Sequence, residues 1–225
     1  SDNITIINDG PGIEVKIHPK YKIYIPELIF GNLLTSSNYD EDEKRITGGT
    51  HGLGAKLTAI YSKKFIIHID DPINQLSYYQ VFENNLAKIN KPIIKKLDKG
   101  TTIGKVSIQF YPDFKKFGQE EEYFSYDLIA LLKKRVYDTA WYLSNSNYIE
   151  NSNNIKVILN EEIINEKIVE DEFNYIKLYN FFNSENKDYI LYTANSKCQG
   201  FSFIITLNRP SNSSESNRQN IISFV

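Results

Sequence analysis

The most constraining feature of the sequence is a glycine-rich segment, residues 46–60, that runs directly into an amphipathic helix. It reads ITGGTHGLGAKLTAI, with four glycines ahead of the lysine. From Leu53 onward, apolar residues at helical spacing predict a helix packed on a core: Leu57, Ile60 and Tyr61. Glycines let a backbone approach a ligand closely, and the first amides of a helix lack internal partners, so this junction predicts an anion site.

Lys56 adds a positive charge to the first turn of this helix. The helix dipole favours acidic residues at this end of a helix, so a lysine there is unfavourable. A polyphosphate between the lysine and the helix end would remove this conflict. Two familiar phosphate motifs fail here. From Gly49 the P-loop pattern reaches Gly54 but continues Ala55-Lys56-Leu57, without the hydroxyl that would hold magnesium, and the dinucleotide motif requires a glycine where Leu57 stands. A flexible surface loop ahead of an ordinary helix remains the alternative.

Composition limits the class of protein. The 225 residues are 41% hydrophobic and 13% aromatic, enough for a real core in one large or two small domains. A net charge of −2, spread along the chain, gives no electrostatic footprint for nucleic acid or an anionic membrane. Cys198 is the only cysteine, and with three scattered histidines it gives no metal-ligand spacing. No apolar run reaches the length of a membrane span, so no membrane partner is expected.

Hydrophobic periodicity predicts an α+β chain. Strands are expected at residues 3–7, 64–69, 78–82, 105–110, 155–159, 188–192, 200–207 and 221–225, and helices at 26–34, 53–61, 120–143 and around 175–182. The helix at 120–143 is expected to open with three glutamates and to cover the sheet through Phe124, Leu128, Leu131, Leu132, Val136 and Leu143. The serine- and asparagine-rich residues 145–154 predict a linker between two domains.

Two polar clusters precede the glycine-rich segment. Asn8, Asp9 and Gly10 end the first strand, where a polar side chain can face a pocket, and an ordinary turn is the alternative. Residues 35–38, Thr-Ser-Ser-Asn, follow the next helix. Their hydroxyl and amide groups can bond ribose or phosphate oxygens, although a solvated helix end has the same composition.

In this order and spacing, these clusters closely resemble the ATPase region of type IIA DNA topoisomerases of the eukaryotic kind. That region shares its fold superfamily with gyrase, a heat-shock chaperone, histidine kinases and mismatch-repair proteins. The matching segments are NDGPGI at 8–13, YIPELIFG at 24–31, LLTSSNYD at 33–40, TGG at 47–49, GLGAKL at 52–57, FYPDF at 110–114, LLKKRVYD at 131–138 and ISFV at 222–225.

The resemblance implies a two-layer α/β sandwich that binds ATP under a mobile lid, at residues 1–144 and without its N-terminal helix. After the linker at 145–154, residues 155–225 are expected to form part of a transducer domain with a ribosomal-protein-like fold. In the parent enzyme, an isomerase, ATP is expected to close a homodimeric gate that captures a DNA segment for double-strand passage. The resemblance also implies magnesium and a nuclear, or otherwise DNA-associated, intracellular location.

Site residues are carried over position by position. Asn8 corresponds to the residue that reads the adenine amino group, and Gly10 and Gly12 to glycines that let the chain pass the base. Groups that bond sugar or phosphate oxygens are Ser36, Ser37 and Asn38, and the lid comprises Gly49, Thr50, His51, Gly52, Leu53, Gly54, Ala55 and Lys56.

No catalytic residue and no metal ligand is expected within the chain. The resemblance places the general-base glutamate and the magnesium-binding asparagine before residue 1, and the lysine that meets the γ-phosphate after residue 225. The chain alone is therefore expected not to hydrolyse ATP.

Three departures keep other functions open. Thr50 and His51 stand where the family has arginine and asparagine, Leu53 replaces an aromatic residue, and Val106 replaces a threonine near the adenine. One alternative is the ATPase domain of a related chaperone or mismatch-repair protein, against which the LLTSSN and TGG segments argue. The other is a nucleotide-binding module that does not hydrolyse ATP, which the altered lid favours.

Overall fold

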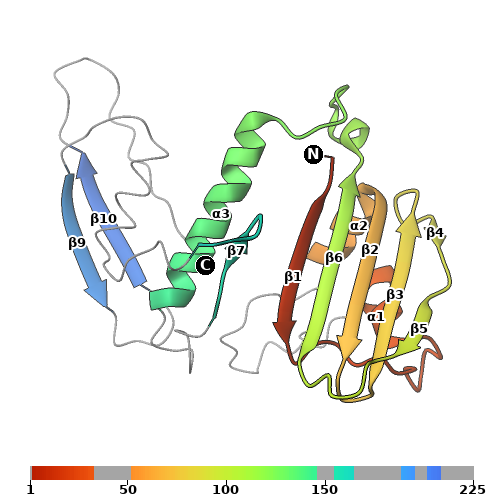
Figure 1. Ribbon diagram of the computed structural model, residues 1–225. Coiled ribbons are helices and arrows are strands. Elements are labelled where there is room, and N and C mark those ends of the chain that lie inside the picture. The colour runs from red at the N-terminus through yellow and green to blue at the C-terminus, as the bar shows by residue number, and fades with distance from the viewer. Residues whose placement is uncertain (1, 33–51, 146–154, 165–188, 196–201, 209–225) are drawn as a thin grey trace. The chain divides into compact units, whose positions relative to one another are not determined.

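The computed structural model describes residues 2–32, 52–145, 155–164, 189–195 and 202–208 (Figure 1). The chain divides into two compact units, Ser1–Phe124 and Ser125–Val225. This division lies ahead of the linker predicted at 145–154, most of which falls outside the described residues, and the predicted domain boundary stays a prediction.

The first unit is built on a six-stranded antiparallel sheet (Figure 1). Its strands are β1 (Ile4–Gly10), β2 (Ser62–Asp71), β3 (Leu76–Glu83), β4 (Lys88–Ile89), β5 (Ile93–Lys96) and β6 (Gly104–Pro112). They follow the order β1-β6-β2-β3-β4, with β5 also paired to β3. The strands predicted at 3–7, 64–69, 78–82 and 105–110 are confirmed as β1, β2, β3 and β6, each somewhat longer. The sequence misses β4 and β5 because both are too short to show an alternating pattern.

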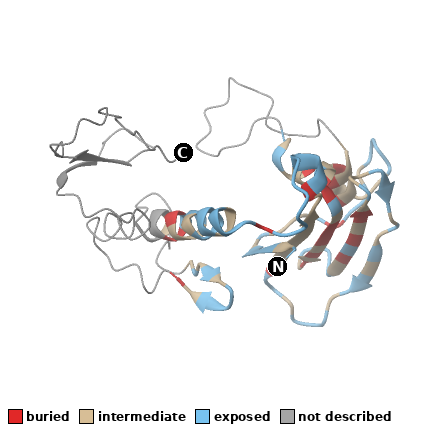
Figure 2. Ribbon diagram, turned by 90° about the horizontal axis from the view of Figure 1, so that it is seen from above, coloured by how far each residue is buried: buried red, intermediate tan, exposed pale blue. Residues whose placement is uncertain are grey.

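Two seven-residue helices, α1 (Ile25–Gly31) and α2 (Gly54–Ile60), cover one face of this sheet (Figures 1 and 2). Pro26 lies in the first turn of α1, directly after Ile25, where its missing N–H costs nothing. The core between helices and sheet consists of Val15, Phe30, Ala59, Phe65, Ile67, Ile69, Tyr78 and Phe82. This two-layer arrangement confirms the predicted α+β class.

The predicted apolar side of α2 is wrong. Leu57 is 49% exposed and Tyr61, just after the helix, is 40% exposed, whereas Lys56 is 2% exposed and Ala59 1%. The helix is only two turns long, so a few apolar residues fit more than one orientation. The small Ala59 belongs to the core and lets the helix approach the sheet.

The helix predicted at 120–143 is α3 (Tyr126–Asn145), which belongs to the second unit. Its predicted opening is wrong, since Ser125 Oγ accepts the Leu128 N–H (3.2 Å) and the three glutamates lie ahead of the helix. The predicted cover of the sheet by this helix stays a prediction, because the sheet belongs to the first unit and α3 to the second. Leu131 and Leu132 are 50% and 36% exposed, while Ala140 is buried with Ile164.

The rest of the second unit is described only as two hairpins. One joins β7 (Ile158–Leu159) to β8 (Glu162–Ile163), and the other joins β9 (Tyr189–Asn195) to β10 (Ser202–Asn208). The strands predicted at 155–159, 188–192 and 200–207 correspond to β7, β9 and β10. The helix predicted around 175–182 and the strand predicted at 221–225 lie outside the described residues.

Candidate functional site

The described part of the predicted nucleotide site comes from β1 and α2. Asn8 lies on β1, and Gly52, Leu53, Gly54, Ala55 and Lys56 lead into and form α2. The other predicted residues, Ser36, Ser37, Asn38, Gly49, Thr50 and His51, lie outside the described residues. Strand β6 pairs with β1 and also contacts α2. The two elements therefore meet at β6.

Asn8 lies on the face of the sheet that the helices cover. It is directly opposite Val106 in the β1–β6 ladder, and Val106 packs against the core on that face. Opposed residues of an antiparallel pair share a face. The Asn8 side chain is exposed, so its amide is accessible to a ligand, whereas Asp9 points to the other face.

The turn after β1 requires glycine at two places. Gly12 has a φ of +76°, a backbone conformation that other residues rarely adopt. Gly104, at the start of β6, lies under the turn: a Cβ on it would be 2.4 Å from the Gly10 carbonyl oxygen. The sequence analysis did not single out Gly104, since nothing local shows that a distant turn crosses it.

The same turn is fixed further along by Asp71, the last residue of β2. Its Oδ2 accepts the Val15 N–H (2.6 Å) and the Asn74 side-chain amide (2.6 Å), and its Oδ1 accepts the N–H groups of Ile73 (2.9 Å) and Asn74 (3.1 Å). Burial alone would raise the pKa of the Asp71 carboxyl, but the hydrogen bonds from Asn74, Val15 and Ile73 together lower it. Asp-Pro-x-Asn, at residues 71–74, is a typical turn sequence, so this turn can be recognised in the sequence. The bond from Asp71 to the distant Val15 cannot.

Lys56, the cation of the predicted site, is buried. It is 2% exposed on α2, whose first turn contains no acid. Burial lowers the pKa of the Lys56 ammonium group by removing water from the charged form. A phosphate beside it would favour the charged form again, which fits the predicted role in binding a triphosphate.

A buried polar network anchors α1 to the sheet. The Gln80 amide donates to Glu27 Oε2 (2.6 Å) and to the Asn90 carbonyl (2.9 Å), and its oxygen accepts the Tyr78 hydroxyl (2.5 Å). Burial raises the pKa of Tyr78, and the negative charge of Glu27 adds to the effect. The Tyr24 ring, just ahead of α1, packs against the Tyr78 ring at 5.7 Å. The network fixes the helix that precedes the predicted Ser36–Ser37–Asn38 cluster.

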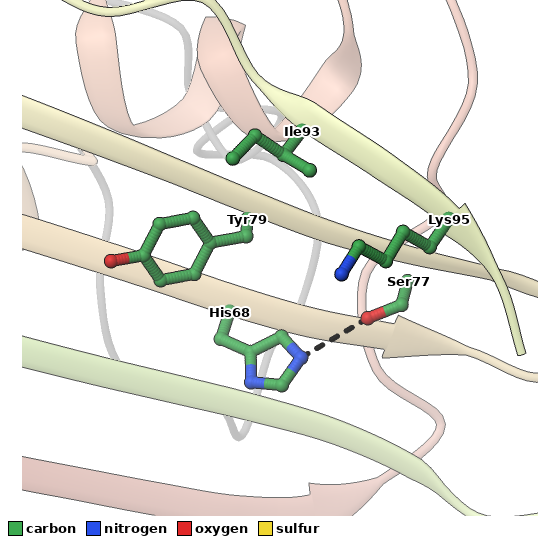
Figure 3. Close-up of a pocket in the computed structure, with 5 residues that line it drawn as sticks. All are labelled: His68, Ser77, Tyr79, Ile93 and Lys95. Atoms are coloured by element: carbon green, nitrogen blue, oxygen red, sulfur yellow. Dashed lines mark hydrogen bonds between the residues drawn. The ribbon is translucent and has the colours of Figure 1, made fainter.

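A second polar cluster lies on the open face of the sheet, in a concavity of about 260 Å³ (Figure 3). Ser77 Oγ donates to Asp70 Oδ1 (2.7 Å) and lies 3.1 Å from His68 Nε2. The residue types are those of a hydrolase triad, but the arrangement is not, because the same His68 nitrogen also faces Asp70 at 3.4 Å. In a triad, the acid orients the histidine through its other nitrogen. The cluster therefore satisfies its own hydrogen bonds and does not activate Ser77.

Among the described residues, no three His, Cys, Asp or Glu side chains come together in a way that could hold a metal ion. In the same part of the chain, no helix has the length and hydropathy needed to cross a membrane.

Comparison with known proteins gives one consistent family. The chain is 44% identical over 189 residues to the probable DNA topoisomerase 2 of Dictyostelium discoideum. The aligned residues make up 84% of this chain and 11% of that protein. No protein-family model matches. The chain spans about a tenth of the length of the curated relatives it matches.

Solved structures agree. The crystal structure of the ATPase region of Saccharomyces cerevisiae topoisomerase II matches with a TM-score of 0.66 and 39% identity, over 79% of this chain and 43% of that one. The ATPase and transducer domains of Balamuthia mandrillaris DNA topoisomerase II match with a TM-score of 0.68 and 32% identity, over 86% of this chain and 45% of that one. These matches favour the topoisomerase assignment over a chaperone or mismatch-repair ATPase. The chain belongs to the DNA topoisomerase II family and corresponds to part of its ATPase region.

Proposed function

We propose that this chain binds ATP as the nucleotide-binding part of a DNA topoisomerase II. The observation that carries the proposal is the arrangement around β6: an accessible amide, Asn8, lies on the strand beside it, and a buried cation, Lys56, lies on the helix that contacts it. An amide can accept the adenine amino group, and an ammonium group suits phosphates. A molecule that carries a purine at one end and a polyphosphate at the other fits this pair of groups.

The remaining roles follow from the family. Ser36, Ser37 and Asn38 would bond sugar or phosphate oxygens, and Gly49, Thr50, His51, Gly52, Leu53, Gly54 and Ala55 would wrap the triphosphate together with Lys56. Magnesium, when bound, would stabilise the negative charge of the phosphates, and its protein ligand is expected outside this chain.

In the whole enzyme, ATP binding would close a dimeric gate on a DNA segment, and hydrolysis with product release would reopen it. Such a gate works through a shift in conformational populations, because the closed state binds the nucleotide more tightly. The two subunits, the DNA and a nuclear location belong to this proposal for the whole enzyme.

Calorimetric titration with ATP and with adenosine tests the proposal. Replacing Lys56 by alanine should weaken ATP binding by about tenfold or more, the loss of one charge-assisted contact to phosphate, and should leave adenosine binding nearly unchanged. Lys99→Ala, which removes an exposed lysine in the turn after β5, is the matched control. Equal loss for both ligands, or no ATP binding by the unaltered chain, would refute the proposal.

A further inference from the structure

The segment between β1 and α1 is tied to the end of β2 by one buried carboxylate. Asp71 is 2% exposed and Val15 1% exposed, and the bond between them joins residues 56 positions apart in the chain. Both carboxylate oxygens are occupied, each by two donors. Hydrogen bonds to an ionised acceptor are roughly twice as strong as neutral ones, so this attachment resists displacement.

The path from β1 to this attachment is short and constrained. Gly10 ends β1 directly above Gly104, and Gly12 then takes its positive φ next to the Asp70 carbonyl, which a Cβ on Gly12 would approach to 3.5 Å. The backbone of residues 10–15 is thus held against the ends of β6 and β2, at Gly104 on one side and at Asp71 on the other.

Asn8 lies only two residues before this held segment. Its side-chain oxygen would be 3.4 Å from a Cβ on Gly10, so the position of the turn bears directly on the position of the amide. We propose that Asp71 is a positioning residue for purine recognition, holding the turn at residues 10–15 so that Asn8 can accept the base amino group. This inference rests on the proposed function and adds a residue to it that does not touch the nucleotide.

Asp71→Asn tests the attachment with little change in shape. The amide retains one oxygen, which can still accept from the turn at Ile73 and Asn74, but its nitrogen cannot accept the Val15 N–H. Lys56 lies on a separate element, so phosphate binding should persist. We expect ATP binding to weaken by about tenfold, the effect of misplacing one hydrogen bond.

The deciding measurement is discrimination between bases. The full chain is titrated with ATP and with the triphosphate of purine riboside, which lacks the amino group that Asn8 would read. The unaltered chain should prefer ATP, and Asp71→Asn should remove most of that preference by weakening ATP alone. Asp98→Asn, the same change at an exposed turn residue, should keep the preference.

Gly12→Ala provides a second route to the same turn, in case Asp71→Asn does not fold. Alanine at a φ of +76° is strained, so the turn must shift while Asp71 and Val15 stay intact. It too should remove the preference for ATP. If either folded variant loses affinity equally for both triphosphates, or keeps the preference, the positioning role is refuted. If the unaltered chain binds neither triphosphate, it is the proposed function that fails.

Discussion

Gln80, in the middle of β3, donates its side-chain amide to the carboxylate of Glu27 in the first turn of α1, at 2.6 Å. Glu27 is the only acid in that turn, and the helix start has no side-chain cap. The bond therefore attaches the first turn of α1 to the sheet through its one acidic side chain.

Replacing Gln80 by leucine should destabilise the fold by about 2 kcal/mol or more, because the Tyr78 hydroxyl and the Glu27 carboxylate lose a buried partner. Urea unfolding measures the change. Gln119→Leu, at an exposed position, is the matched control and should change stability by less than about 0.5 kcal/mol. Equal effects of the two substitutions would show that the network contributes little.

The contribution of Asp71 to stability should depend on pH. Its pKa is lower in the folded chain than in the unfolded one, so the folded state favours the ionised carboxylate. The resulting stabilisation is fully present above the unfolded pKa of about 4 and is lost as the pH falls through the folded pKa. Asp71→Asn should therefore cost about 3 kcal/mol near pH 7 and distinctly less near pH 3. Unfolding curves of both chains at the two pH values provide the comparison, and a cost that does not change with pH would contradict the prediction.

Gly54→Ala should separate stability from nucleotide binding. Gly54 begins α2, and none of the described atoms lies within 4 Å of a Cβ added there. Alanine in a helix is more favourable than glycine by roughly 0.5–1 kcal/mol, so the melting temperature should rise. The added methyl group would crowd the approach of phosphates to the backbone, so ATP affinity should fall. A variant that gains stability and keeps its ATP affinity would place the triphosphate elsewhere.

This chain on its own should not hydrolyse ATP. Attack by water on the γ-phosphate needs a positioned base and a metal, and among the described residues the acids nearest the predicted site are otherwise engaged. Glu27 accepts from Gln80, Asp71 accepts four hydrogen bonds, and Asp9 lies on the opposite face of the sheet from Asn8. Phosphate release should stay at background, with Lys56→Ala as the control for contaminating enzymes. Phosphate release that Lys56→Ala abolishes would show that the chain contains a catalytic base.

The long strands and the class of fold could be predicted from the sequence because they depend on local alternation. β2 buries Phe65, Ile67 and Ile69. This alternation is visible in the sequence whichever strands lie beside β2 in the sheet. The position of Asn8 at the end of a strand was predictable for the same reason.

Contacts between distant segments were not predictable. The sequence does not show that Asp71 bonds Val15, that Gln80 meets Glu27, or that Gly104 lies under Gly10, since each depends on strand pairing. Leu57 was predicted to be buried and is exposed, while Lys56 is buried, because a helix of two turns carries too little periodicity to fix its orientation.

The close approach of Gly104 to Gly10 also governs how the sheet can assemble. β1 and β6 come from opposite ends of the first unit, and they pair with Gly10 opposite Gly104. A slip of one residue would bring Ile103 or Lys105, each with a side chain, to the place where a Cβ would lie only 2.4 Å from a backbone oxygen. It would also turn Asn8 to the other face. A pair of residues without side chains thus acts as a register stop, allowing the first strand of the chain to join the sheet in only one alignment.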